Sequence, residues 1–225
     1  MAGIHERTRR RLVVAIDGPS GVGKTTVARG VAAALGIPHL DTGAYYRLAT
    51  LLTLEAGRDP AAADDVLLSL AHAAVDFADG LLVVNGTPIG GRLRSGEVTD
   101  AVSIVAAHPS VRERVVQMQR EWVADHGGSA VVEGRDIGTA VFPDAPVKVF
   151  LTADVATRAM RRSRDPESGG ADLGDLAAKM SLRDHLDSSR ETSPLRPAGD
   201  AVIVDTTHLA ASQVVATILD LVGAV

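Results

Sequence analysis

Hydrophobic positions along the chain alternate between two spacings. Residues 12–17 (LVVAID) form a run rich in β-branched residues that ends at a glycine, which predicts a buried parallel strand. From Lys24 to Leu35 the apolar positions recur at helical spacing, and Gly36 with Pro38 supplies a stop signal. The pattern predicts a strand, a glycine-containing loop and a helix, in that order.

The same rhythm continues along the chain. Residues 38–41 are a second strand candidate, and a helix is predicted over 44–55. The further elements expected are strands at 130–132, 147–151 and 201–204, a helix from Pro109 to the glycine pair at 127–128, and a C-terminal helix over 212–222. Strands separated by helices imply a parallel sheet covered on both faces, and so the α/β fold class.

The rhythm breaks between about residues 65 and 96. A helical patch is followed by two apolar runs, 81–85 and 87–89, with Asn85-Gly86 between them. This dipeptide is the strongest short hairpin signal, so a small antiparallel insertion is expected here. A polar stretch over 165–174 is expected to be a mobile loop.

Composition narrows the function. A chain of 225 residues is expected to be one globular unit with an insertion. No apolar run reaches membrane-spanning length, and residues 1–11 are polar and basic, so a disordered tail and no membrane partner are expected. The absence of cysteine fits a reducing cytoplasm. A formal charge of −5 argues against a nucleic-acid partner and favours a small substrate.

One motif identifies a nucleotide. Residues 18–25 (GPSGVGKT) match G-x-x-x-x-G-K-[ST] between a predicted strand and a predicted helix, the context that this motif requires. Glycines let backbone N–H groups surround phosphates, Lys24 reaches the outer phosphates, and Thr25 can bind magnesium. The predicted nucleotide-binding residues are Gly18, Pro19, Ser20, Gly21, Val22, Gly23, Lys24, Thr25 and Thr26.

Two further segments suit an acceptor nucleotide. Residues 41–47 (DTGAYYR) carry a hydroxyl, both tyrosines of the chain and an arginine at the start of a helix, although a capped helix with tyrosines in the core explains them too. Residues 133–136 (EGRD) follow a strand at the sheet edge where ligands of α/β folds bind. A surface ion pair is the alternative there.

Two clusters of charged residues, most of them arginines, follow toward the C-terminus. The first cluster consists of Arg158, Arg161, Arg162 and Arg164, which precede the polar loop and could close over phosphates as a lid, or could be a solvated helix face. The second consists of Arg183, Asp187 and Arg190, which share one side of a helix and could bind phosphate or pair with each other.

Taken together, these segments resemble bacterial cytidylate kinases, a family of P-loop nucleoside monophosphate kinases. The resemblance covers nearly the whole chain and rests on IDGPSGVGKTT, LDTGAYYR, VRERVVQMQR, EGRDIGTAVFPDAPVKVFL, RAMRR and RDHLDSSRETSPLRPA. It implies transfer of the γ-phosphoryl group of ATP to CMP or dCMP, with magnesium, by a protein expected to be a cytoplasmic monomer.

The implied fold is a three-layer α/β/α domain over 12–225, with a central parallel sheet of about five strands. Its parts would be a core (12–41, 100–157 and 177–225), an acceptor-binding region with the insertion (42–99) and a short lid (158–176). The substrate-binding residues implied are Thr42, Tyr46, Arg47, Arg112, Arg135, Asp136, Arg183, Asp187 and Arg190. The catalytic residues implied are Lys24, Arg135, Arg158, Arg162 and Arg183.

Two positions depart from the common pattern of the family. Thr42 stands where serine is frequent, and Glu133 stands where aspartate is frequent; either change could alter the CMP to dCMP ratio or the water network around magnesium. Two rival functions remain at this point. One is a kinase for UMP, AMP or shikimate, and the other is a nucleotide-binding regulator without catalysis.

Overall fold

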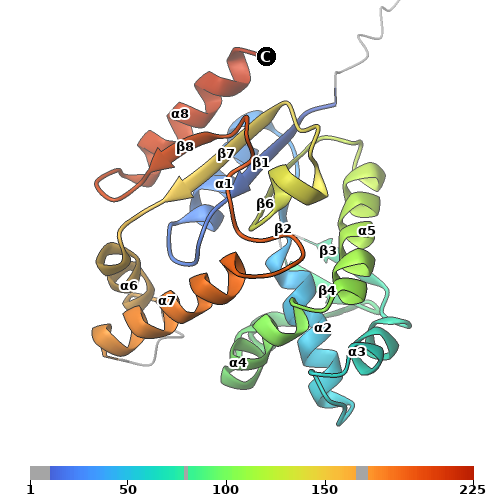
Figure 1. Cartoon of the computed structure of the whole chain (residues 1–225). Helices are drawn as coiled ribbons and strands as arrows, with labels where there is room; N and C mark the ends of the chain where they lie inside the picture. Colours follow the sequence, from blue (N-terminus) through green and yellow to red (C-terminus); the bar gives the residue numbers. More distant parts are fainter. Residues whose placement is uncertain (1–10, 79–80, 166–171) are drawn as a thin grey trace, which may run out of the picture.

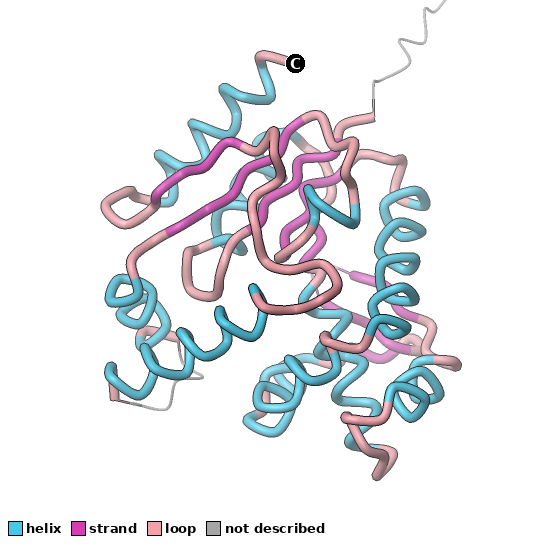
Figure 2. Tube along the Cα trace, viewed as in Figure 1, coloured by secondary structure: helices cyan, strands magenta, loops and turns pink. Residues whose placement is uncertain are grey.

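The computed structural model of the chain describes residues 11–78, 81–165 and 172–225. The tail expected to be disordered (1–11) and the loop expected to be mobile (165–174) lie largely outside these residues. The described elements form three layers, with a twisted sheet between helices (Figure 1, Figure 2). The expected α/β class is confirmed.

Five parallel strands form the central sheet in the order β2-β6-β1-β7-β8. They are β1 (Val13–Asp17), β2 (His39–Asp41), β6 (Ala130–Gly134), β7 (Val147–Thr152) and β8 (Val202–Asp205). Each lies where the hydrophobic pattern predicts a strand. The carboxyl ends of β1, β2 and β6 are neighbours, which brings the loops that follow them together.

The described helices lie on both faces of the sheet and around the insertion. They are α1 (Lys24–Leu35), α2 (Gly43–Glu55), α3 (Ala63–Leu70), α4 (Gly96–Val105), α5 (Pro109–Asp125), α6 (Val155–Ser163), α7 (Leu173–Ser188) and α8 (Ala211–Gly223), with a 3₁₀ turn at Gly90–Arg94 and a π turn at Ile137–Val141. None of these helices is long and apolar enough to span a membrane.

Strand β1 shows how the two faces are divided. Val14 and Ile16 pack in a core cluster with residues of α1 and α8, whereas Ala15 belongs to a second cluster with residues of α5. Successive strand residues point to opposite faces, so a strand covered on both sides is apolar throughout. This explains the continuous LVVAI run in the sequence.

The insertion contains a small antiparallel sheet of β3 (Val75–Ala78), β4 (Leu81–Val84) and β5 (Thr87–Pro88). Asn85 and Gly86 both have positive φ, 49° and 79°, as a two-residue type I′ turn requires. The predicted hairpin is confirmed. Strand β3 is not predicted by the pattern, because four residues with a central aspartate carry too little hydrophobic signal.

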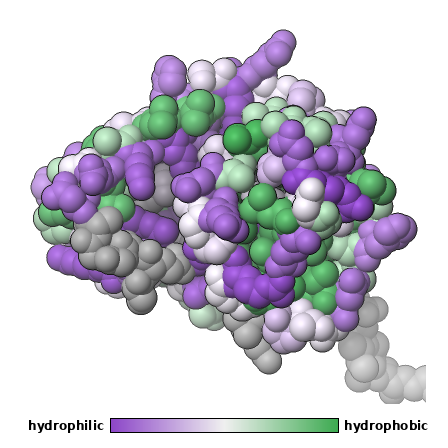
Figure 3. Space-filling model, turned by 90° about the horizontal axis from the view of Figure 1, so that it is seen from below, coloured by the Kyte–Doolittle hydropathy of each residue, from purple (hydrophilic) through white to green (hydrophobic). Residues whose placement is uncertain are grey.

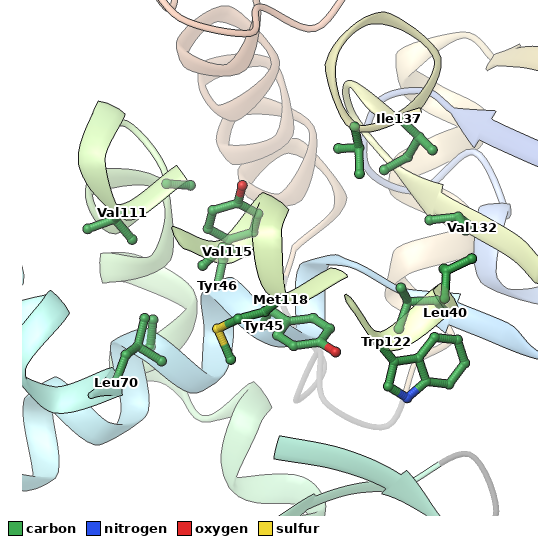
Figure 4. Packing of buried hydrophobic residues seen from close by; sticks show 14 of the residues in the cluster. Leu40, Tyr45, Tyr46, Leu70, Val111, Val115, Met118, Trp122, Val132 and Ile137 are labelled. Carbon is green, nitrogen blue, oxygen red and sulfur yellow. The ribbon is translucent and has the colours of Figure 1, made fainter. Parts of the chain in front are cut away.

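Aromatic contacts join the insertion to the core. Tyr45 of α2 lies 5.6 Å from Phe77 of β3, and Phe77 lies 5.7 Å edge-on from Trp122 of α5 (ring centroids). Figure 4 shows Tyr45, Tyr46 and Trp122 among the apolar residues of this cluster. Edge-to-face pairs of this kind add about 0.5–1.5 kcal/mol beyond the area they bury. The insertion therefore has a defined position on the core.

Candidate active site

A cleft of about 670 Å³ opens at the carboxyl ends of the parallel strands. It extends from the loop after β1 to residues of α2, α4, α5 and α7. Ten arginines and one lysine line it, against five aspartates and glutamates. Much of the surface seen from below is likewise hydrophilic, with hydrophobic patches between (Figure 3). Such an excess of positive charge suits a polyanionic ligand.

Glycine at the start of the loop is required by a close approach of two strands. Gly18 has φ of 149°, and a Cβ there would lie 2.3 Å from the carbonyl oxygen of Leu151 in β7. Gly21 and Gly23 also have positive φ, and α1 begins directly after the loop, at Lys24. The loop therefore ends at a helix N-terminus, where free N–H groups favour anions.

Lys24 is buried beside its own loop. Its Nζ donates hydrogen bonds to the carbonyl oxygens of Gly18 (2.9 Å) and Pro19 (2.8 Å). Burial lowers the pKa of Lys24 to about 7, and the nearby charge of Arg135 acts in the same direction. An anionic phosphate would stabilise the charged form of this ammonium group better than the two carbonyls do.

Thr25, Glu133 and His39 form a hydrogen-bonded line that begins at the cleft with Thr25 and ends behind it at His39. The hydroxyl of Thr25 donates to Oε2 of Glu133 (3.1 Å), and Oε1 of Glu133 lies 2.9 Å from Nε2 of His39. Asp41 is close by, and its pKa is raised by burial and by the charge of Glu133. This line brings a hydroxyl and a carboxylate together beside the phosphate loop.

The residues present fit magnesium as a shared ion. Mg²⁺ takes oxygen ligands and commonly combines one or two protein groups with substrate phosphates and water. Thr25 and Glu133 supply such oxygens beside the loop. Among the described residues no group of three or more His, Asp or Glu side chains is arranged to hold a metal by itself. The site therefore suits magnesium held jointly with a nucleotide, not a protein cage.

Thr42 lines the cleft at the start of α2, next to the end of β6. Its hydroxyl donates to the carbonyl oxygen of Glu133 (2.7 Å), and it is buried. A Cβ at Gly134 would lie 2.6 Å from this hydroxyl oxygen. Glycine at 134 is therefore what lets α2 start so close to the end of β6.

A buried ion pair forms the far wall of the cleft. Arg112 of α5 contacts the carboxylate of Asp136 and donates to the carbonyl oxygen of Ala106 (3.1 Å). The guanidinium carbon of Arg112 also lies 5.3 Å from the ring centre of Tyr46. Arg112 and Asp136 are at most 5% exposed, and the buried Nε of Arg112 has no hydrogen-bond partner among the described residues. The pair is thus a buried, charged part of the cleft wall.

A second ionic cluster surrounds Asp187, near the C-terminal end of α7. Asp187 accepts a hydrogen bond from Arg135 (Nε to Oδ2, 3.0 Å) and contacts Arg190. Burial would raise the pKa of Asp187, but Arg135 and Arg190 lower it overall. Arg183 faces the same cleft; burial and the charge of Arg135 lower its pKa to about 10, and its buried Nε has no partner within the described part of the chain. Cations crowded in this way favour an added anion.

The arginines of α6 divide into two groups. Arg158 is 4% exposed and does not line the cleft; it donates to the carbonyl oxygen of Ser20 (3.2 Å) and pairs with Asp184 of α7. Arg161 and Arg162 do line the cleft, and Arg162 donates to Asp165 (3.0 Å). As placed here, Arg158 braces the phosphate loop against α7, and its predicted catalytic role stays a prediction.

Asp17 joins the end of β1 to the segment after β6 through hydrogen bonds to backbone N–H groups. Its carboxylate accepts hydrogen bonds from the N–H groups of Ile137 and Gly138, both at 2.8 Å. Asp17 is the last residue of β1, and the two amides follow Arg135 and Asp136 in the chain. Because the partners are more than a hundred residues apart, no local sequence signal marks this contact.

Most of the residues predicted from sequence meet in this cleft. Those that line it are Ser20, Gly21, Val22, Gly23, Lys24, Thr25, Thr26, Thr42, Tyr46, Arg47, Arg112, Arg135, Asp136, Arg162, Arg183, Asp187 and Arg190. Gly18, Pro19 and Arg158 do not line it. Sequence reasoning missed Asp17 and His39. Thr206 also lines the cleft, and its hydroxyl accepts from Arg161 (2.9 Å) and donates to the carbonyl oxygen of Val22 (3.2 Å).

Comparison with known proteins identifies the family. The cytidylate kinase family model matches residues 14–224. Cytidylate kinases of Mycobacterium leprae and Mycobacterium avium are 50% and 49% identical over 213 and 217 residues, each covering 94% of this chain and 95% of the relative. An uncharacterized protein from Eubacterium ventriosum, 16% identical, shares the fold with a TM-score of 0.53 over 96% of this chain and all of that one. The chain therefore belongs to the cytidylate kinase family.

Proposed function

We propose that this protein, an ATP-dependent phosphotransferase, transfers the γ-phosphoryl group of ATP to CMP or dCMP and releases ADP with CDP or dCDP. The observation that carries the proposal is the continuity of the cleft. One end is the phosphate loop with Lys24, and the other is the buried pair of Arg112 and Asp136 beside Tyr46. A second nucleotide fits between a polyphosphate site and a charged pocket with an aromatic wall.

The loop forms the donor half of the site. Its backbone N–H groups and the N-terminus of α1 bind the phosphates of ATP, and Lys24 moves its hydrogen bonds from the loop carbonyls to the outer phosphates. Thr25, supported by Glu133, holds magnesium together with the nucleotide. The bound ion contributes charge neutralisation at the phosphates.

Side chains form the acceptor half. Thr42, Tyr46 and Asp136 border the space for the cytosine ring, where the carboxylate can accept a hydrogen bond from the exocyclic amine. The remaining acceptor roles follow the ionic clusters: Arg47, Arg135 and Arg183 toward the monophosphate, Arg112 with Asp136 toward the base, and Asp187 with Arg190 toward the ribose. Bidentate arginine pairs suit a phosphate group better than a single lysine does.

The chemical step needs no strong base. An oxygen of the acceptor phosphate forms a bond to the γ-phosphorus while the bond from that phosphorus to the bridging oxygen of ADP breaks, and the bonding electrons leave with ADP. Negative charge spreads over the transferred group, so Lys24, Arg135, Arg162 and Arg183 contribute chiefly by position and charge. Closure of the lid (158–176) would exclude water and so prevent hydrolysis.

Three features of the proposal go beyond the family assignment. They are the division into core, acceptor-binding region (42–99) and lid (158–176), the monomeric state and the cytoplasmic location. All three are expected from the sequence. Sedimentation of the purified chain with and without nucleotide tests the monomeric state.

An acceptor panel tests the function directly. Purified protein is incubated with γ-labelled ATP, magnesium and one acceptor at a time: CMP, dCMP, UMP, AMP or shikimate. We expect label in CDP and dCDP at rates far above the others. Preferred labelling of another acceptor would mean that this acceptor, and not CMP or dCMP, is the substrate. ADP formation with none of them would favour the regulator, provided that ATP binding is intact.

A further inference from the structure

His39 contacts the carboxylate that supports the magnesium site. It lies on the edge strand β2, two residues before Asp41, and its side chain is 15% exposed. Nε2 of His39 lies 2.9 Å from Oε1 of Glu133, whose side chain is 3% exposed. His39 does not line the cleft. It therefore cannot act on the nucleotide directly, but it contacts a group that can.

Glu133 needs such support because its side chain is flexible. Its side chain has one more rotatable bond than aspartate, and a flexible carboxylate loses more rotamer entropy when it is fixed. In this structure each carboxylate oxygen has a partner on a different side: Thr25 holds Oε2 and His39 holds Oε1. Two anchors on opposite oxygens fix the plane of the carboxylate. With the anchor at Oε1 removed, the side chain is free to turn about its last bond.

We infer that His39 is a positioning residue that orients the Glu133 carboxylate toward Thr25 and so toward magnesium in the nucleotide complex. The inference rests on the proposed function only for the presence of a magnesium–nucleotide complex and says nothing about the acceptor. Groups that hold metal-site carboxylates from the side are general in proteins, and their loss typically costs 10- to 100-fold in metal affinity or activity. A partly exposed histidine on an edge strand can be replaced with little damage to the core.

Two substitutions separate positioning from packing. His39→Gln keeps an N–H donor near the place of Nε2, whereas His39→Leu removes it. His72→Leu is the matched control, since His72 is exposed and outside the cleft. The dissociation constant of ADP is measured by calorimetry with magnesium and with chelator, without any acceptor present. Unfolding temperature is recorded for each variant.

The inference predicts a specific pattern. For His39→Leu the gain in ADP affinity on adding magnesium falls about tenfold, while ADP affinity in chelator and the unfolding temperature stay at the wild-type values. His39→Gln and His72→Leu keep the full gain. In turnover assays His39→Leu requires more magnesium for half-maximal rate, and its KM for CMP is unchanged.

Other patterns overturn the inference. An unchanged magnesium gain in His39→Leu, or no magnesium gain in the wild-type protein, would show that the histidine does not act through the metal. Equal loss of ADP affinity with and without magnesium would indicate a packing role instead. Because the calorimetric measurements contain no acceptor, their outcome is independent of the acceptor panel, and either proposal can fail alone.

Discussion

The donor and acceptor halves of the cleft are built in different ways. The donor side is nine consecutive residues, 18–26, from the loop and the start of α1, and they offer backbone amides and one lysine. The acceptor half takes side chains from α2, α5, α7 and the segment after β6, and several of its charges are already paired in the structure, as Arg112 with Asp136 and Arg135 with Asp187. One half is defined by local backbone shape, and the other by long-range ionic contacts.

The difference separates binding of charge from recognition of a base. Backbone amides read any polyphosphate, so they need no specific side chains. A buried ion pair is costly to desolvate and is weak evidence for stability, but removal of one partner leaves an uncompensated charge. The acceptor half therefore gives up stability in exchange for fixed hydrogen-bonding groups, and substitutions in the two halves should change different kinetic constants.

The largest effect is expected at Lys24. Lys24→Ala should lower kcat by about 10³-fold, about 4 kcal/mol, because the cation that stabilises charge on the transferred group is lost. The CMP dissociation constant, measured by calorimetry, should change less than about threefold. Lys179→Ala, which removes an exposed lysine of α7 outside the cleft, is the control. A raised CMP dissociation constant in Lys24→Ala would mean that the two halves are not separable.

Asp17 spans both halves, and its titration tests how firmly they are joined. Burial raises its pKa to about 6, so the folded protein keeps this proton to a higher pH than the unfolded chain. Between about pH 4 and pH 6 the unfolded chain releases the proton first. The contribution of Asp17 to stability therefore falls by roughly 3 kcal/mol as pH rises through this window and is constant above it.

The measurement compares wild type with Asp17→Asn by urea unfolding at half-unit steps from pH 4 to pH 7.5. Asparagine does not titrate, so the free energy of unfolding of wild type minus that of the variant should decrease with rising pH and then level off. A difference that is flat over the whole range would show that Asp17 is ionised normally in the fold and that its contacts to the amides of Ile137 and Gly138 dominate.

Asp136 tests the acceptor half alone. Asp136→Ala should raise the KM for CMP about 10- to 100-fold, since a charged hydrogen bond to the base contributes about 1.5–3 kcal/mol and Arg112 is left unpaired. The ATP dissociation constant should stay unchanged. Asp144→Ala, an exposed carboxylate, is the control. Unchanged CMP affinity in Asp136→Ala would contradict the role given to this residue.

The same contrast explains what the sequence could predict. The five strands of the central sheet, helix α1 and the Asn85-Gly86 hairpin follow from patterns within a few residues, and all are confirmed. The donor loop is equally local. Most acceptor residues were picked out by their position after a strand or on one helix face, whereas Arg112 was found only through the family resemblance, because it carries no local signal. Asp17 and His39 were missed for the same physical reason: each acts on a partner more than ninety residues away.

The smallest effect is expected where the chain departs from the family pattern at Thr42. Thr42→Ser keeps the hydroxyl that donates to the carbonyl oxygen of Glu133 (2.7 Å) and removes one methyl group. A buried methyl is worth about 0.8 kcal/mol, so kcat/KM for CMP should change less than about fourfold. The ratio of kcat/KM for CMP to that for dCMP is the sensitive readout, with Thr50→Ser, a buried threonine of α2 outside the cleft, as the control.

If Thr42→Ser changed the CMP to dCMP ratio by tenfold or more, the methyl group of Thr42 would set the position of the base and, through it, that of the sugar. Such a change would also show that the acceptor half depends on apolar contacts as closely as on its ion pairs. An unchanged ratio is expected instead, because the groups proposed for the ribose, Asp187 at the end of α7 and Arg190 just after it, are far along the chain from Thr42, which precedes α2.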